Sequence, residues 1–268
     1  MINDFNFLEI LGAEISTKDA SSKTVFWGVA PTGDIHIGYL PYVGVLKHLK
    51  NIGYRIIIFI GDYHGYLDSE KTEFSKIEER SKNYFLFFTR LGFNSDDILF
   101  AKIEYKNPKY IDELFKFSKY IKLNESLKYA ERTLKSFETD DTTLADGLYV
   151  LTQILDLEYF NVNLVLSGLD EAGIYKLGIP IIEEQFNRKI DFFYFPMVKG
   201  VNEDEMHSSN NEENKILIFE KAENIISKLE NNPLLIEQIN NYIFPIFQIP
   251  SNNGLDDTVN HLINIWNE

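Results

Sequence analysis

The chain has no cysteine among its 268 residues. Disulfide bonds, thiolate metal ligands and a cysteine nucleophile are therefore excluded. No apolar run approaches the roughly 18 residues that a membrane-spanning helix needs. The first residues also lack the basic start, long apolar run and small-residue cleavage site of a signal peptide. The sequence therefore predicts a soluble, cytoplasmic protein without a membrane partner.

Positive charge is scarce as well. Lysine and arginine number 26 against 41 acidic residues, which gives a net charge of −15. A phosphate-covered partner is repelled overall by such a chain, although a local basic patch can still bind one. Residues 101–135 are such a stretch, with nine basic against five acidic residues, a net +4. They fit either a solvated helical face or a docking surface for an anionic partner.

The residues that are present favour a folded α/β protein. Apolar residues make up 44% of the chain and charged residues 25%, which excludes general disorder. A β-prone run at 25–29 ends in a Pro-Thr-Gly turn, apolar residues then recur at helical spacing over 40–49, and a continuous apolar run follows at 55–60. This order of strand, helix and strand is typical of a βαβ unit.

A second α/β half begins near residue 144. A helix is expected to run through residue 156, followed by buried strands at 163–166 and 192–197. Residues 70–135 and 216–268 are predicted to be helical, and 199–214 form a polar loop. We find no internal repeat. The expected fold is a Rossmann-like parallel sheet with helices on both faces.

The first strand-to-helix junction has the composition of a phosphate site. Gly33 and Gly38 let the backbone approach a ligand closely, the following helix presents unpaired N–H groups, and His36 adds a donor. In open α/β sheets such a junction faces the ligand crevice. A lone histidine after a glycine turn is also commonly a surface residue, so both interpretations stay open.

Five separated motifs resemble the tyrosyl-tRNA synthetase family, especially its archaeal and eukaryotic branch, in collinear order over roughly residues 20–217. They are similar to the HIGH signature, the D-L-H-A-Y-L stretch, the amino-acid-binding helix, the G-G-x-[DE]-Q segment and the KMSKS-type loop of that family. In this chain they read His36-Ile37-Gly38-Tyr39, Asp62–Leu67, Tyr149–Asp156, Ser167–Glu171, and Met197–Gly200 with Glu205–Ser209.

The resemblance implies a class I synthetase catalytic domain over residues 1–215 with a helical insert at about 70–143. Residues 216–268 would be a short helical remnant of the anticodon-binding domain. Enzymes of this family use ATP and Mg²⁺ to convert an amino acid to an aminoacyl-adenylate, and catalysis depends on positioning and positive electrostatics at the phosphates. The resemblance also implies a homodimer packed through the insert, where aromatic residues between 84 and 120 can supply apolar contacts.

Individual roles follow from the same resemblance. His36 would donate to the α-phosphate region, Asp170 would accept from the ribose, and Asp156 would meet the phenol of a tyrosine substrate. The implied catalytic residues are His36, Tyr39, Lys199, Ser208, Ser209 and Lys215; those at ATP are Gly33, Gly38, Gly168, Asp170 and Met206; those at the amino acid are Phe26, Gly28, His64, Tyr149, Gln153, Asp156 and Glu171.

Each role has a structural alternative. Tyr149 and Gln153 are an i, i+4 pair that could hydrogen-bond on a helix surface. His64 could be a hydrogen-bonded core histidine, and Asp170 could cap a helix. Three polar groups on one helix face, however, need partners if they are buried.

The chain departs from the family at four places. Glu205 replaces the signature lysine, which reverses a charge at the triphosphate unless Lys199, Lys215 or Mg²⁺ compensates; Glu205 could itself hold Mg²⁺. Phe26 stands where the family usually has a tyrosine that hydrogen-bonds the substrate phenol. Glu171 replaces a glutamine and makes the amino-group pocket more anionic. The chain ends at Glu268 with an acidic helical segment, so anticodon reading is not expected.

These observations predict an enzyme that activates tyrosine or a related aromatic amino acid with ATP and transfers it to an acceptor other than tRNA. The alternatives are a divergent tyrosine-tRNA ligase that holds only the acceptor stem, and a non-catalytic binder of an amino acid or nucleotide. A tRNA-dependent cyclodipeptide synthase ranks last, because those proteins lack the HIGH-type and KMSKS-type loops.

Overall fold

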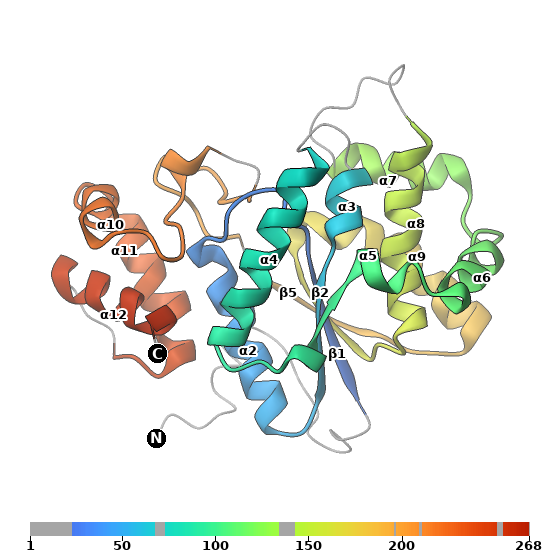
Figure 1. Cartoon of the computed structure of the whole chain (residues 1–268), viewed down its shortest axis with the longest axis horizontal. Coiled ribbons are helices and arrows are strands. Elements are labelled where there is room, and N and C mark those ends of the chain that lie inside the picture. Colours follow the sequence, from blue (N-terminus) through green and yellow to red (C-terminus); the bar gives the residue numbers. More distant parts are fainter. Residues whose placement is uncertain are drawn as a thin grey trace.

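Five parallel strands form the centre of the molecule. The computed structural model describes residues 23–67, 73–133, 143–195, 197–208, 211–250 and 254–267. Within these ranges the sheet has the order β3-β2-β1-β4-β5, with helices on both sides (Figure 1). The strands are β1 (Thr24–Val29), β2 (Arg55–Ile60), β3 (Ile98–Phe100), β4 (Leu164–Gly168) and β5 (Asp191–Phe195). The prediction of a Rossmann-like α/β fold is confirmed.

The helices follow the strands in an α/β order. Short 3-10 turns lie at η2 (Ile37–Tyr39), η3 (Ser95–Asp97), η4 (Leu169–Glu171), η5 (Glu212–Asn214) and η7 (Phe244–Phe247), and η6 (Ile239–Ile243) is a π-helix. The α-helices are α2 (Leu40–Asn51), α3 (Asp62–Leu67), α4 (Phe74–Arg90), α5 (Ala101–Glu104), α6 (Pro108–Phe117), α7 (Leu123–Thr133), α8 (Leu144–Tyr159), α9 (Ala172–Phe186), α10 (Ala222–Leu229), α11 (Pro233–Gln238) and α12 (Leu255–Asn267).

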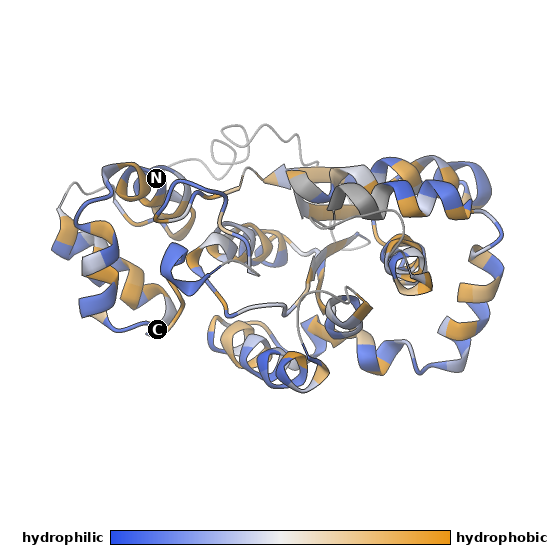
Figure 2. Ribbon diagram, turned by 90° about the horizontal axis from the view of Figure 1, so that it is seen from above, coloured by the Kyte–Doolittle hydropathy of each residue, from blue (hydrophilic) through white to orange (hydrophobic). Residues whose placement is uncertain are grey.

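Alternate residues of the strands feed two hydrophobic cores. Val25 and Trp27 of β1 point to one face, where α2 and α4 cover the sheet. Phe26 points to the other face, which α6, α8 and α9 cover. Because both faces are covered, the strands are buried almost throughout, as expected for a parallel sheet. Most helices therefore combine apolar and polar faces (Figure 2).

The strand order reverses between β1 and β4. β1 pairs with β2 on one side and with β4 on the other. In doubly wound sheets, ligands bind in the crevice outside the carboxyl ends of the strands at this reversal. The loop at 30–36 and the turn η4 both leave the sheet at that edge. The fold therefore places two of the predicted motifs beside the crevice.

The C-terminal helices α10 to α12 lie beside α2 at one end of the molecule (Figure 1). Ile225, Leu262 and Trp266 belong to the same core cluster as Val25 of the sheet. The core therefore continues from the sheet into these helices, and the domain boundary at residue 215 stays a prediction.

One strand differs from the prediction. Residues 70–135 were expected to be helical, but Ile98–Phe100 form β3 and pair with β2 at the sheet edge. The strand has three residues and follows a capped turn, so it is too short to give a periodic pattern. Within the expected insert at 70–143, α4 and β3 therefore belong to the sheet and its cover, and α5 to α7 follow them. No helix within the described residues has the length and apolar character needed to cross a membrane.

Candidate active site

His36 is buried at the carboxyl edge of β1, with 2% of its surface exposed. Its ring stacks on Tyr39 with the centroids 4.5 Å apart. In the described part of the chain neither ring nitrogen has a hydrogen-bond partner. Burial, with smaller effects of Lys215 and His207, lowers its pKa to about 3, so the imidazole is neutral at physiological pH. The alternative of a surface histidine is wrong, and two polar atoms are left for a ligand.

Two glycines of this loop lie so close to neighbouring atoms that no side chain fits there. A Cβ on Gly38 would lie 2.8 Å from Nδ1 of His36. A Cβ on Gly33 would lie only 1.6 Å from the carbonyl oxygen of Ser208. Any side chain at Gly33 would therefore displace one of the two loops.

The loop at 197–208 closes over the loop at 30–38. The hydroxyls of Thr32 and Ser208 lie 2.6 Å apart, and Lys215 Nζ donates to the Ser208 carbonyl at 2.7 Å. Lys215 is 1% exposed, and burial lowers its pKa. Met206 is also buried, with its carbonyl oxygen 3.9 Å from the Cβ position of Gly38. The predicted residues Gly33, Gly38, Met206, Ser208 and Lys215 are thus brought together around His36.

Helix α4 contributes two residues that the sequence analysis missed. Arg80 Nη1 donates to the Thr32 carbonyl at 2.7 Å, and its Nε lies 3.3 Å from Asp34. The Tyr84 hydroxyl donates to the Gly33 carbonyl at 3.1 Å. In the sequence both are ordinary members of a charged amphipathic helix, so no local signal marks them.

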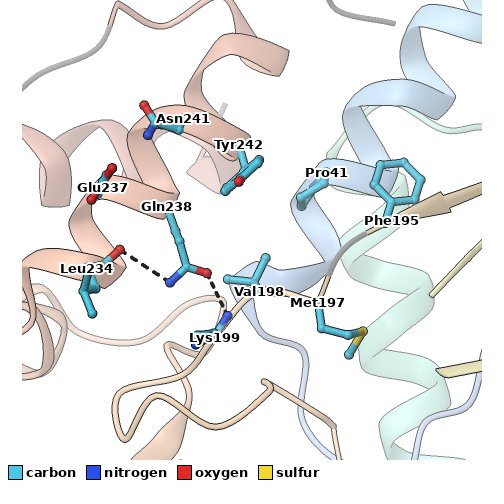
Figure 3. A pocket seen from close by; sticks show the side chains of 10 residues that line it. All are labelled: Pro41, Phe195, Met197, Val198, Lys199, Leu234, Glu237, Gln238, Asn241 and Tyr242. Atoms are coloured by element: carbon cyan, nitrogen blue, oxygen red, sulfur yellow. Dashed lines mark hydrogen bonds between the residues drawn. The ribbon is translucent and has the colours of Figure 1, made fainter. Parts of the chain in front are cut away.

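Lys199 and Ser209, the other predicted catalytic residues of the KMSKS-type loop, are not among the residues around His36. The exposed side chain of Lys199 lines a cavity of about 370 Å³ together with residues of α2, β5, α11 and η6 (Figure 3). The Lys199 backbone N–H donates to Gln238 of α11 at 2.9 Å. Ser209 lies outside the described residues. Lys199 is therefore held toward the C-terminal helices.

Glu205 is exposed, and its carboxylate lies 3.2 Å from Nε2 of His207. Among the described residues there is no group of three or more histidine, aspartate or glutamate side chains placed to hold a metal ion. The Mg²⁺ role of Glu205 stays a prediction.

A second cluster lies on α8. Gln153 is buried, and its Nε2 donates to the Tyr175 hydroxyl at 3.2 Å and to Glu171 at 3.4 Å. The Ser167 hydroxyl donates to the other Glu171 oxygen at 2.9 Å. In the described part of the chain Gln153 Oε1 is buried without a partner. This acceptor and the Glu171 carboxylate suit a protonated amine.

Other predicted residues surround this cluster. Tyr149 is 8% exposed, with its ring edge-on to that of His64 at 5.5 Å between centroids. The alternative of a surface pair at Tyr149 and Gln153 is therefore wrong. Gly168 ends β4, and Asp170 lies in η4, although its side chain is outside the described part. A Cβ on Gly65, which follows His64 in α3, would lie 3.5 Å from the methyl group of Thr32, so α3 packs against the loop after β1.

Asp156 is 1% exposed and already has partners. The Tyr110 hydroxyl donates to its Oδ1 at 2.7 Å, and the Tyr105 hydroxyl donates to Oδ2 at 2.8 Å. The Tyr105 hydroxyl also lies 3.1 Å from Nε2 of His64, which is 3.1 Å from Thr152 Oγ1. His64 is thus a hydrogen-bonded core histidine. Burial raises the pKa of Asp156 to about 8. The two tyrosines were not anticipated, because only the folded chain brings them to α8.

The wall beside this network is apolar. Phe26 is 2% exposed, with its ring 5.4 Å from that of Phe59 and 6.2 Å from that of Phe160. A Cβ on Gly28 would lie 3.4 Å from the Phe26 ring, so the ring folds back against β1.

The chain is similar to known proteins over almost its whole length. Residues 18–260 match the family described as class I tRNA synthetases of the W and Y type. A probable cytoplasmic tyrosine--tRNA ligase of Vairimorpha ceranae is 27% identical over 259 residues, which cover 91% of this chain and 77% of that protein.

Two solved structures share the fold. Tyrosyl-tRNA synthetase from Archaeoglobus fulgidus, complexed with L-tyrosine, matches with a TM-score of 0.74 and 20% sequence identity. The match covers 97% of this chain and 86% of the synthetase chain. Tryptophanyl-tRNA synthetase from Plasmodium falciparum has a TM-score of 0.67 at 17% identity, with coverages of 97% and 75%.

Proposed function

Because the chain belongs to the class I tRNA synthetases of the tryptophan and tyrosine type, we propose that it activates tyrosine or a related aromatic amino acid with ATP. In this reaction the amino-acid carboxylate attacks the α-phosphate, pyrophosphate leaves, and an aminoacyl-adenylate results. The aminoacyl group then passes to an acceptor other than tRNA.

One observation carries the nucleotide part of the proposal. His36 has two buried ring nitrogens without partners in the described structure, at the strand-order reversal and beside Gly33 and Gly38. A neutral imidazole can donate one hydrogen bond to a phosphate oxygen without an unpaired buried charge. Gly168, Asp170 and Met206 would complete the ATP site, with Tyr39, Ser208 and Ser209 beside the phosphates. ATP would bring its own Mg²⁺, which neutralises phosphate charge.

The amino group of the substrate would bind at the second cluster. The unpartnered Gln153 Oε1 and the carboxylate of Glu171 are hydrogen-bond acceptors, which an ammonium group with three donors can satisfy. Tyr149 would lie beside the bound amino group, and Phe26 and Gly28 would form the apolar wall next to the amino acid. A carboxylate in place of an amide favours the protonated amine more strongly.

The positive charge at the phosphates would come from Lys215 and Arg80. Glu205 is exposed, so its negative charge lies in high dielectric, where its repulsion of the phosphates is weak. Lys215 is buried against Ser208 and is close enough to His36 to lower that histidine's pKa. Lys199 lies toward the C-terminal helices and would contribute only after the loop moves.

The acceptor proposal rests on charge. The segment from residue 216 to the C-terminus carries two lysines against seven acidic residues. Neutralised phosphates supply most of the affinity of proteins for nucleic acids, and this segment offers few cations for that purpose. A small amine or a peptide is a better acceptor for such a surface.

Amino-acid-dependent exchange of pyrophosphate into ATP tests the activation step. We expect exchange with at least one aromatic amino acid, and a loss of at least about tenfold in His36→Ala. His48→Ala is the matched control, because His48 lies in the last turn of α2, about 12 Å along the helix from its start. Exchange with no aromatic amino acid, combined with measurable binding, would instead identify a non-catalytic binder.

Charging of total tRNA with the same labelled amino acid tests the acceptor. We expect exchange without charging. Charging at a rate comparable to exchange would identify a tyrosine-tRNA ligase that uses the basic stretch 101–135, and it would overturn the acceptor proposal alone.

We also propose a cytoplasmic homodimer. Ile103, Phe115 and Leu123, on α5, α6 and α7, are 64%, 72% and 60% exposed, so each can contribute apolar contacts to a second copy. Sedimentation of the full chain should give a dimer, and Phe115→Glu should give a monomer.

A further inference from the structure

The loop that carries His36 is held by a segment from the C-terminal side of the chain. Two backbone hydrogen bonds, of 3.0 and 2.9 Å, join residues 35–37 to residues 216–218. They lie on either side of His36, which forms an antiparallel bridge with Leu217. The position of His36 in the crevice therefore depends on where the segment 216–218 lies.

Lys215 precedes this segment and joins it to the loop at 197–208. Its buried Nζ donates to the Ser208 carbonyl at 2.7 Å. The backbone carbonyl of Lys215 accepts a hydrogen bond of 2.7 Å from Nζ of Lys228, in the last turn of α10. Lys215 is therefore fixed at both ends, by the loop at its side chain and by a C-terminal helix at its backbone.

Lys228 donates to three acceptors around the same segment. Besides the Lys215 carbonyl, its Nζ lies 2.6 Å from Glu220 Oε1 and 3.3 Å from the Glu212 carbonyl. The other oxygen of Glu220 accepts the Leu217 backbone N–H at 3.0 Å. The side chains of Lys228 and Glu220 are 18% and 9% exposed, so solvent screens this pair less than a surface pair. The pair ties α10 to the backbone of residues 215–217.

A second C-terminal side chain is directed the same way. Asn232, at the N-cap of α11, is buried, and its Nδ2 donates to the Val201 carbonyl at 2.8 Å. Lysine occurs only twice from residue 216 onward, and one of the two, Lys228, is directed toward the loops of the crevice. These contacts favour a supporting role of the C-terminal helices at the crevice.

We infer that Lys228, together with Glu220, is a positioning residue for amino-acid activation, which holds His36 and Lys215 at the phosphates through residues 215–218. The inference rests on the proposed function, because it assumes that His36 and Lys215 bind the phosphates of ATP. Hydrogen bonds of charged groups are stronger than those between neutral groups, so the Lys228 ammonium is an effective clamp. A displacement of about 1 Å at a reacting group can slow a reaction by about 100-fold.

Kinetics of pyrophosphate exchange in Lys228→Met test this role. We expect the KM for ATP to rise at least about tenfold, while the KM for the amino acid, proposed to bind at Gln153 and Glu171, stays within about twofold. A smaller folded fraction would lower the apparent kcat and leave both KM values unchanged. Lys221→Met is the matched control, because it removes the same charge from the exposed N-cap of α10. An unchanged KM for ATP in Lys228→Met would overturn the inference.

Amide hydrogen exchange of the full chain tests the same link without turnover. The backbone amides of Ile37 and Ile218 should exchange at least about tenfold faster in Lys228→Met than in Lys221→Met. Equal rates in the two variants would overturn the inference and leave the proposed function intact. Absence of pyrophosphate exchange in the wild type would instead overturn the proposed function, and the amide rates would still decide whether Lys228 holds the His36 loop. If Lys228→Met does not fold, the double variant with Glu220→Gln, which leaves no unpaired buried carboxylate, replaces it in both measurements.

Discussion

The buried carboxyl of Asp156 should make the stability of the protein depend on pH. Burial raises its pKa from 3.8 to about 8, against the opposing effect of the Tyr105 and Tyr110 hydrogen bonds. Between these two values the folded state keeps a proton that the unfolded state releases. The free energy of unfolding therefore falls as pH rises from about 4 to about 8, by about 1.4 kcal/mol per unit at most.

Two buried histidines act in the opposite direction at lower pH. Burial lowers the pKa of His36 to about 3 and that of His64 to about 4, from 6.5. Their contribution to stability is complete above pH 6.5 and is lost as pH falls toward these values. Below pH 6.5 the two histidines stabilise the fold as pH rises, and together they outweigh the loss from Asp156. Above pH 6.5 only Asp156, of these three groups, still changes stability. Stability should therefore be greatest near pH 6.5 and fall by about 2 kcal/mol by pH 8.

Urea unfolding followed by circular dichroism at pH 6.5, 7.25 and 8 measures this decline. Asp156→Asn replaces the carboxyl with a group that cannot ionise, so the variant should lose the decline of about 2 kcal/mol. Asp96→Asn, at an exposed aspartate of η3, is the matched control and should keep it. Parallel curves for wild type and Asp156→Asn over this range would refute the assignment of the decline to Asp156.

Three further changes test the loops and the packing. Gly33→Ala places a Cβ 1.6 Å from the Ser208 carbonyl oxygen, so we expect the two loops to separate, with pyrophosphate exchange at least about tenfold slower and faster proteolysis after residue 197. Gly44→Ala places a Cβ 1.5 Å from Cγ2 of Ile246 and should destabilise the contact between α2 and η7 by about 1–3 kcal/mol in urea unfolding, whereas the double variant with Ile246→Ala should recover part of the loss. Glu205→Lys changes an exposed side chain, so stability should stay within about 0.5 kcal/mol while exchange increases; unchanged exchange would show that this position lies too far from the phosphates to matter.

The sheet was largely predictable, because parallel strands buried on both faces leave continuous apolar runs in the sequence. Arg55–Ile60 is such a run, and its predicted bounds agree with β2. β3 was not predicted, because a strand of three residues at the edge of a sheet is too short to show either a long apolar run or an alternating pattern in the sequence. Its pairing with β2 is a tertiary contact that local pattern does not report.

The site could be predicted only where its functional residues lie close together in one short segment of the sequence. The glycines and histidine of the loop after β1 lie within six residues of one another, and the structure confirms their close approach. Arg80 reaches Thr32 across 48 residues, and Tyr110 reaches Asp156 across 46. Such contacts depend on how helices pack, so neither periodicity nor spacing reveals them.

The distribution of satisfied and unsatisfied polar groups distinguishes ligand-binding from structural parts of the crevice. A buried polar atom without a partner costs free energy, so a folded protein keeps one mainly where a ligand or water supplies the bond. Among the side chains of the described residues, such atoms occur at two places, His36 and Gln153. Asp156, by contrast, has a tyrosine hydroxyl at each oxygen, so its polar atoms already have partners within the fold. These two unsatisfied places are therefore where the proposed function puts the phosphate and the ammonium group of the ligands.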